Sequence, residues 1–237
     1  MSTKIIVSYD GTANEDDAVA LGRIFARAGA DVSVAYVRHT KEPDYSGETL
    51  AQNEAQELVD RGAALLGTPD ATGHVVTDRS TPEGLRTLAE TEGADAIVFC
   101  SDSHTAKGHI AIGNSAERLL EGGRTAIAVA PVGLAQSAAE AGGQLADLRS
   151  VVAVGDADGG ARATAEALAG ALGATVAPVA NDDAGLLVID SRPEAQPGQV
   201  SVSASASHLI EIATCPVLVV PRGVALSFGR ATVGVTA

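Results

Sequence analysis

The sequence predicts an α/β protein: a doubly wound parallel sheet followed by a shortened second copy of the same winding. Short β-branched runs alternate with Ala-rich segments whose apolar residues have helical spacing. The 237 residues are 46% hydrophobic but only 3% aromatic, with no Trp. The opening pattern also returns in the second half. An aliphatic core of this kind suits buried parallel strands covered by helices.

In the first half, strands and helices are expected in strict alternation. The first strand, residues 4–8, ends at Tyr9-Asp10-Gly11-Thr12, and a helix follows with Asn14 as its predicted N-cap. Further elements are expected at 31–37 (strand), 49–66 (helix), 73–77 (strand), 81–93 (helix, with Pro in its first turn), 95–100 (strand), 114–121 (helix) and 124–130 (strand). This order calls for a doubly wound parallel sheet.

The second half repeats the first in shortened form. IIVSYD at 5–10 is echoed by VVAVGD at 151–156, AIVFC by LLVID, and TAIAVAP by CPVLVVP. Because 90 positions separate Asp10 from Cys100 but only 34 separate Asp156 from Asp190, the second copy lacks two helices and a strand. We predict a domain at 1–131, an Ala/Gly/Ser-rich linker at 132–148, and a truncated domain at 149–237. Its tail, 222–237, either adds a strand to a sheet edge or remains loose.

Charge and composition exclude several classes of function. A formal net charge of -14 argues against general binding to nucleic acid or to anionic membranes. The two cysteines, Cys100 and Cys215, lack metal-type spacing and favour a reduced, cytoplasmic protein. We expect no signal peptide, no membrane span, no metal site and no catalytic constellation. The GDADGG stretch at 155–160 is expected to be a turn.

The loop after residue 100 carries the clearest motif. Cys100 is followed after two residues by Ser103, and after nine more by Gly113-Asn114, with Ala-Glu-Arg-Leu-Leu next at 116–120. This spacing resembles the universal stress protein family, whose nucleotide-binding members carry Gly, two residues, Gly, nine residues, Gly and Ser or Thr. Only Gly113 is kept. The chain is similar to the tandem form, which implies an adenine-nucleotide α-hydrolase-like fold with strand order 3-2-1-4-5.

The resemblance also implies a nucleotide site in the first copy. Asp10 matches the pocket aspartate after the first strand, and Val37 the strand end at the adenine site. Phosphates would lie over backbone N–H groups at a helix start. The implied site residues are Asp10, Val37, Cys100, Ser103, Gly113, Asn114, Ser115 and Ala116. A structural alternative makes Asn114 the N-cap and Glu117 its capping-box partner. His104, Lys107 and His109 either attract polyphosphate or lie in a solvated loop.

The second copy departs further from the motif. The same spacing falls on Asp190, Pro193 and Ser203-Ala204, with no signature glycine. Prolines also remove backbone donors from this loop. We therefore expect no nucleotide in the second copy.

Three functions follow from these observations. The first is a stress-response regulatory module that binds ATP or another adenine nucleotide weakly in its first copy. The second is a structural or interaction protein without a cofactor. The third, a slow ATP hydrolase, lacks a recognisable base, metal ligand or arginine finger, so we expect no enzyme. Self-association is expected through the closing strands, 124–130 and 215–220, as a pseudo-dimer within the chain or between chains.

Overall fold

A computed structural model describes residues 2–12, 14–39, 45–68, 71–140, 148–178 and 184–229, with the side chains of α2 described from Gln52 onward. The strands are β1 (Lys4–Ser8), β2 (Asp31–His39), β3 (Gly73–Asp78), β4 (Ala96–Cys100), β5 (Ala126–Ala130), β6 (Ser150–Val154), β7 (Thr175–Ala177), β8 (Leu186–Asp190) and β9 (Val217–Val220). The helices are α1 (Glu15–Arg27), α2 (Tyr45–Leu66), α3 (Thr81–Glu92), α4 (Asn114–Leu120), α5 (Leu134–Glu140), α6 (Gly160–Leu172) and α7 (Ala204–Ile212).

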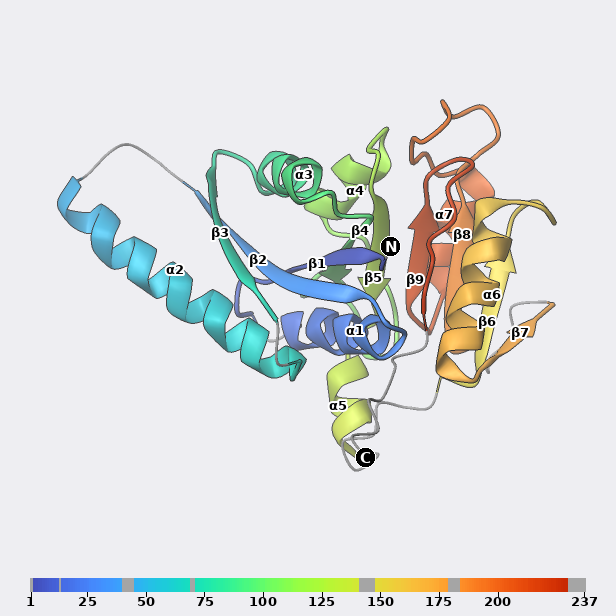
Figure 1. Cartoon of the computed structure of the whole chain (residues 1–237), viewed down its shortest axis with the longest axis horizontal. Helices are drawn as coiled ribbons and strands as arrows, with labels where there is room; N and C mark the ends of the chain where they lie inside the picture. Colours follow the sequence, from blue (N-terminus) through green and yellow to red (C-terminus); the bar gives the residue numbers. More distant parts are fainter. Residues whose placement is uncertain are drawn as a thin grey trace, which may run out of the picture.

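These strands form one sheet in the order β3-β2-β1-β4-β5-β9-β8-β6-β7 (Figure 1). The first five pair in parallel, which confirms the predicted order 3-2-1-4-5. The remaining four repeat that winding without its third strand, as the shortened repeat predicted. Because the sheet passes through both copies, the division into domains at 131 and 149 stays a prediction about folding units.

The two copies join through their closing strands. β5 pairs antiparallel with β9, with Ile127 opposite Val219 and Val129 opposite Val217. The expected pseudo-dimer is thus formed within the chain, while association between chains stays a prediction. A matching pair of bonds marks the repeat: the Ser101 hydroxyl donates to the Ala130 carbonyl at 2.7 Å, and the Ser191 hydroxyl to the Val220 carbonyl at 2.7 Å.

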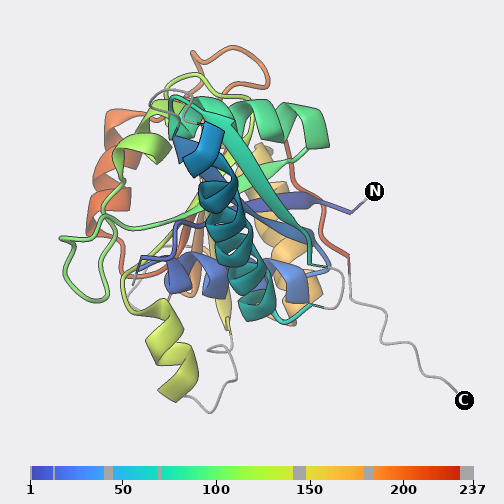
Figure 2. The same ribbon diagram turned by 90° about the vertical axis from the view of Figure 1, so that its left-hand side faces the viewer.

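Apolar cores on both faces of the sheet are shared by the two copies. On one face α1 and α6 each pack against the strands, with Phe25 and Leu168 both fully buried. On the other face α3, α4 and α7 cover the sheet, with Leu85 and Ile210 among their buried residues. Figure 2 shows α3 and α1 on opposite sides of the sheet. The antiparallel joint therefore lies inside a continuous core.

The predicted linker contains a short helix that is anchored to the first copy. The buried carboxylate of Asp17 in α1 accepts the backbone N–H groups of Gly133 at 2.8 Å and Ala135 at 2.7 Å, at the start of α5. These bonds supply acceptors for helix-start donors that lack an intrahelical partner. The first residues of the predicted linker are therefore held against α1.

The tail adopts neither predicted form over its described part. Residues 222–229 contain no strand, yet they are packed. Leu226 is buried and its N–H donates to the Thr164 hydroxyl in α6 at 2.9 Å. The Phe228 ring stacks on Phe25 of α1, with ring centroids 6.0 Å apart. This segment connects α1 and α6 because its apolar side chains enter the core that the two copies share; residues 230–237 lie outside the described part.

Candidate functional site

The candidate site lies where three neighbouring parallel strands end. Val7 of β1 is in register with Val34 of β2 and Val98 of β4. Asp10 and Cys100 follow at the same edge of the sheet, and this is where ligands of open α/β folds bind. The side chain of Val37 is only 5% exposed and packs against α3 at Gly84, and β2 continues past Val37 to His39.

The loop between β4 and α4 is folded back on itself beside the start of α1. The Asp102 N–H donates to the Ala111 carbonyl at 3.0 Å, and the Asn14 side-chain amide donates to the Asp102 carbonyl at 3.4 Å. These contacts bring the loop that carries Cys100 and Ser103 next to the turn that carries Asp10. Sequence spacing alone could place both segments at one sheet edge, but not in contact.

The predicted cap of α4 is wrong by one residue. Gly113 is the N-cap, with φ -74° and ψ 159°, and Asn114 is the first helical residue. No side chain caps this helix start, so the predicted Asn114–Glu117 capping box is not formed. The chain is extended at Gly113 and turns helical directly after it, so the Gly113 carbonyl accepts the first helical bond, from the Glu117 N–H. A Cβ at residue 113 would meet nothing within 4 Å, so there is room for a side chain at this position.

Glu15 is a site residue that the sequence analysis missed. It is 6% exposed, and its carboxyl oxygen Oε2 accepts the N–H groups of Asp10 and, at 3.1 Å, Gly11. Burial, together with the neighbouring Asp10 carboxylate, raises the pKa of Glu15 to about 9. Its position, on the same helical face as Ala18 and Phe25, was the signal that could have revealed it.

Burial also makes Cys100 unreactive. It raises the pKa of the thiol to about 12, with Glu15 and Asp10 adding to the effect, so the thiol stays protonated at neutral pH. This environment agrees with a structural role for Cys100.

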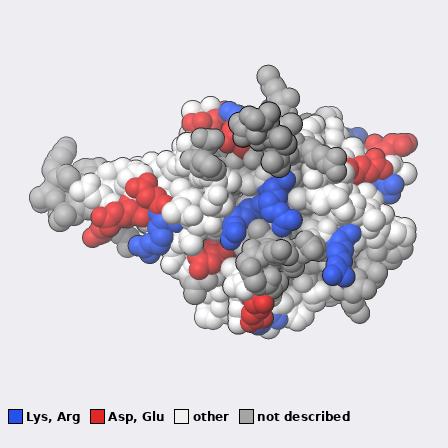
Figure 3. All heavy atoms as spheres, turned by 60° about the horizontal axis from the view of Figure 1, so that its bottom comes forward, with Lys and Arg blue, Asp and Glu red and all other residues white. Residues whose placement is uncertain are grey.

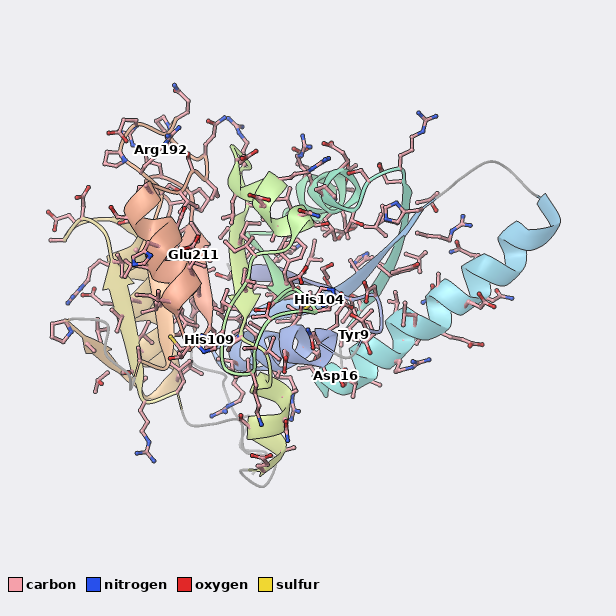
Figure 4. All side chains as sticks on the ribbon, turned by 180° about the vertical axis from the view of Figure 1, so that it is seen from behind. Tyr9, Asp16, His104, His109, Arg192 and Glu211 are labelled. Carbon is pink, nitrogen blue, oxygen red and sulfur yellow. The ribbon has the colours of Figure 1, made fainter. Side chains whose placement is uncertain are left out.

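The basic residues of the loop do not gather at the site. The Lys107 ammonium donates to the Gln136 side chain on α5 at 3.0 Å, which directs it away from the strand ends. Figure 4 shows His104 and His109 well apart, with His109 away from Tyr9 and Asp16. On the face in Figure 3, Asp and Glu form small groups separated by Lys and Arg. The hypothesis of a combined basic field from three residues is therefore not supported by their positions.

In the second copy the equivalent space is filled by a carboxylate. Asp190 stands where Cys100 stands in the first copy, and its Oδ1 accepts the Ala161 N–H at the start of α6 at 2.7 Å. The other oxygen, Oδ2, is buried with no hydrogen-bond partner in the described part of the chain. Cβ atoms at Gly155 and Gly159 would come within 2.2 and 2.1 Å of Oδ2. The GDADGG turn thus wraps closely around Asp190.

No helix in the described part of the chain combines the length and apolar character that a bilayer span requires.

Comparisons with known proteins agree with this fold. A family model described as "Universal stress protein family" matches residues 1–131. A universal stress protein from Archaeoglobus fulgidus is 14% identical with a TM-score of 0.59, and the match covers 94% of this chain and 100% of that one. A putative universal stress protein from Pseudomonas aeruginosa is 14% identical with a TM-score of 0.58, at 94% of each chain.

Some solved relatives hold adenine nucleotides. A universal stress protein in complex with cAMP is 22% identical with a TM-score of 0.33, over 40% of this chain and 73% of that one. At this level of similarity, the bound cAMP is a property of that protein and is not transferred to this chain. A search of curated protein sequences found no match. On the match to residues 1–131, the chain belongs to the universal stress protein family.

Proposed function

We propose that the chain is a regulatory binding module whose first copy binds an adenine nucleotide weakly. The observation that carries this proposal is the uncapped, open backbone at Gly113–Ser115, beside the strand ends that hold Asp10 and Cys100. The adenine would lie against the backbone at Val37, the ribose near Asp10, and the phosphates over the N–H groups that start α4.

Two features support weak rather than tight affinity. Cys100 and Ser103 place side chains where nucleotide-binding family members keep glycines. The carboxyl groups of Asp10, Glu15 and Asp17 all act on the Cys100 thiol, which means that they surround the same edge of the sheet. A polyphosphate would meet an unfavourable field there, relieved only by the proton that Glu15 retains at neutral pH.

We also propose that the module is not an enzyme. Glu15 and Cys100, with pKa values raised to about 9 and about 12, are protonated at neutral pH and supply neither a base nor a thiolate. The free thiols of Cys100, which is partly buried, and of Cys215, which is buried, fit the expected cytoplasmic location. Absence of ATP turnover with magnesium would support this part of the proposal, and measurable turnover would contradict it.

The test is calorimetry with ATP, ADP, AMP and cAMP on the wild type and on Gly113→Val. The variant should abolish binding without disturbing the fold, because residue 113 has ordinary backbone angles and open space around its Cβ. Ser203→Val is the matched control, since Ser203 caps α7 with nearly the same angles, φ -80° and ψ 160°. It should leave binding unchanged.

The second candidate function is an interaction module without a nucleotide. The contact that favours it is Glu15, which already accepts the N–H groups of Asp10 and Gly11. The combined Cys100→Gly, Ser103→Gly variant separates the two candidates. Tighter nucleotide binding would support the first, and continued absence of heat with every nucleotide would leave the interaction module.

A further inference from the structure

A large cavity lies between the two copies and not at the candidate nucleotide site. Its volume is about 910 Å³, and none of the candidate nucleotide residues lines it. It opens on the sheet face covered by α4 and α7, next to the β5–β9 joint. This volume falls in the range of small-molecule pockets, roughly 300–1,000 Å³.

The floor of the cavity is aliphatic and comes from both copies. Ile110 and Leu120 of the first copy and Ile210 of the second line it, each no more than 5% exposed. Ile112 and Val202, which are partly buried, complete it. Apolar atoms of a ligand would therefore leave water on entering.

Backbone bonds between the copies hold the cavity open. The Gly122 N–H donates to the Val200 carbonyl at 2.9 Å, and the Val200 N–H donates to the Gly123 carbonyl at 2.7 Å. On the far side the Arg222 guanidinium donates to the Ala195 carbonyl at 2.7 Å, which fixes the loop after β8. A ligand would thus meet a preformed site and would not have to order these loops.

The charged groups around the floor are mostly acidic and come as a pair from each copy. Glu117 and Glu121 belong to α4 and its end, and Glu194 and Glu211 to the second copy. Arg192 is the one cationic residue among the described lining residues. Figure 4 shows Arg192 in the loop after β8 and Glu211 on α7. The cavity is therefore unfavourable for anions and favourable for cations.

We propose that this inter-copy cavity binds an aliphatic polyamine. Such a molecule carries ammonium groups separated by methylene chains, which matches a cavity lined by aliphatic residues and by two glutamates from each copy. The methylenes would cover Ile110, Leu120 and Ile210, while ammonium groups at the two ends meet the glutamates of opposite copies. A single-charged amine satisfies only one of the two acidic pairs, and a metal ion makes no use of the floor.

Calorimetry with spermidine at physiological salt tests the proposal, with Glu121→Gln and Glu211→Gln combined in the full chain. Both side chains are exposed, so the amides should fold normally. We expect a roughly five- to tenfold loss of affinity from two partly exposed ion pairs. Arg192→Gln should tighten binding, because it removes the one opposing charge. Butylamine, with one ammonium group, should bind more weakly than spermidine.

The matched control must separate this site from general attraction to an acidic protein. Glu54→Gln with Glu57→Gln makes the same change in net charge on the exposed surface of α2, away from the cavity residues. Affinity that falls equally in both double variants would overturn the proposal, as would the absence of spermidine binding by the wild type. Loss confined to the cavity variant supports it.

Discussion

Carboxyl groups occupy backbone donors at the C-terminal edge of the sheet in both copies. Glu15 accepts two N–H groups after β1, and Asp190 accepts the Ala161 N–H at the start of α6. Each carboxyl group stands where an anionic ligand of this fold would be bound. Backbone donors that an anionic ligand could use are therefore already partly occupied, and a ligand in the first copy must coexist with the Glu15 carboxyl group.

Glu15 should make folding stability fall with rising pH. Its folded pKa of about 9 lies above the ordinary value of 4.5, so the folded state holds a proton that the unfolded state releases. Wild-type stability should decrease as pH rises from about 4.5 to 9 and then level off. Glu15→Gln keeps the acceptor oxygen without a titratable proton. It should be more stable than wild type by about 1–3 kcal/mol at pH 8 and no more stable near pH 4.5.

Denaturant unfolding of both proteins between pH 5 and 9 measures this difference. Parallel pH profiles for Glu15→Gln and wild type would show that Glu15 ionises normally in the folded state. The exposed residue Asp16 provides the control, because Asp16→Asn should not remove the pH dependence.

Only part of this residue-level chemistry could be predicted from the sequence. Alternating strands placed Asp10 and Cys100 at one edge of the sheet, since parallel strands all end on the same side. The inward turn of Glu15 could not be derived in the same way, because an acidic first helical turn normally faces solvent and the helix dipole. The burial of Asp190 depends on the glycines around it, which sequence spacing marked only as a turn.

Short helices in this chain depend on contacts from elsewhere. A helix of seven residues such as α5 is not stable alone, and its start is held by Asp17 of α1. The sequence predicted only an Ala/Gly/Ser-rich linker in this region. It could not identify the acceptor, because Asp17 lies over 110 positions away in the chain.

Asp17→Ala should detach α5 from α1. The change leaves the N–H groups of Gly133 and Ala135 without their acceptor and should lower the free energy of unfolding by on the order of 2 kcal/mol. Hydrogen exchange should show faster exchange at these two amides. Asp17→Asn keeps one acceptor oxygen, so its free energy of unfolding should fall by less. If both amides stay protected in Asp17→Ala, α5 is held by packing alone.

At the scale of the whole molecule, the internal repeat explains the strand order of the sheet. It does not explain where the C-terminal tail packs. The similarity between the closing strands of the two copies predicted that the copies pair. The pairing of β5 with β9 shows that this contact forms within one chain. Apolar and polar residues alternate only weakly in the tail, so its burial could not be predicted from the sequence pattern. Its place is set by the apolar core that contains residues of both α1 and α6, which Leu226 and Phe228 enter.

Leu226→Ala tests whether the tail couples the two copies. Leu226 is 4% exposed in the core that α1 and α6 share, so its truncation should lower the free energy of unfolding by about 2–4 kcal/mol. Because that core belongs to both copies, hydrogen-exchange protection should fall in α1 and α6 together. Ser227→Ala should change neither the free energy of unfolding nor the hydrogen-exchange protection. The Ser227 side chain is exposed, and its backbone carbonyl still accepts the Thr3 hydroxyl. Loss of protection confined to α6, with α1 unaffected, would instead mean that the copies open as independent units despite their continuous sheet.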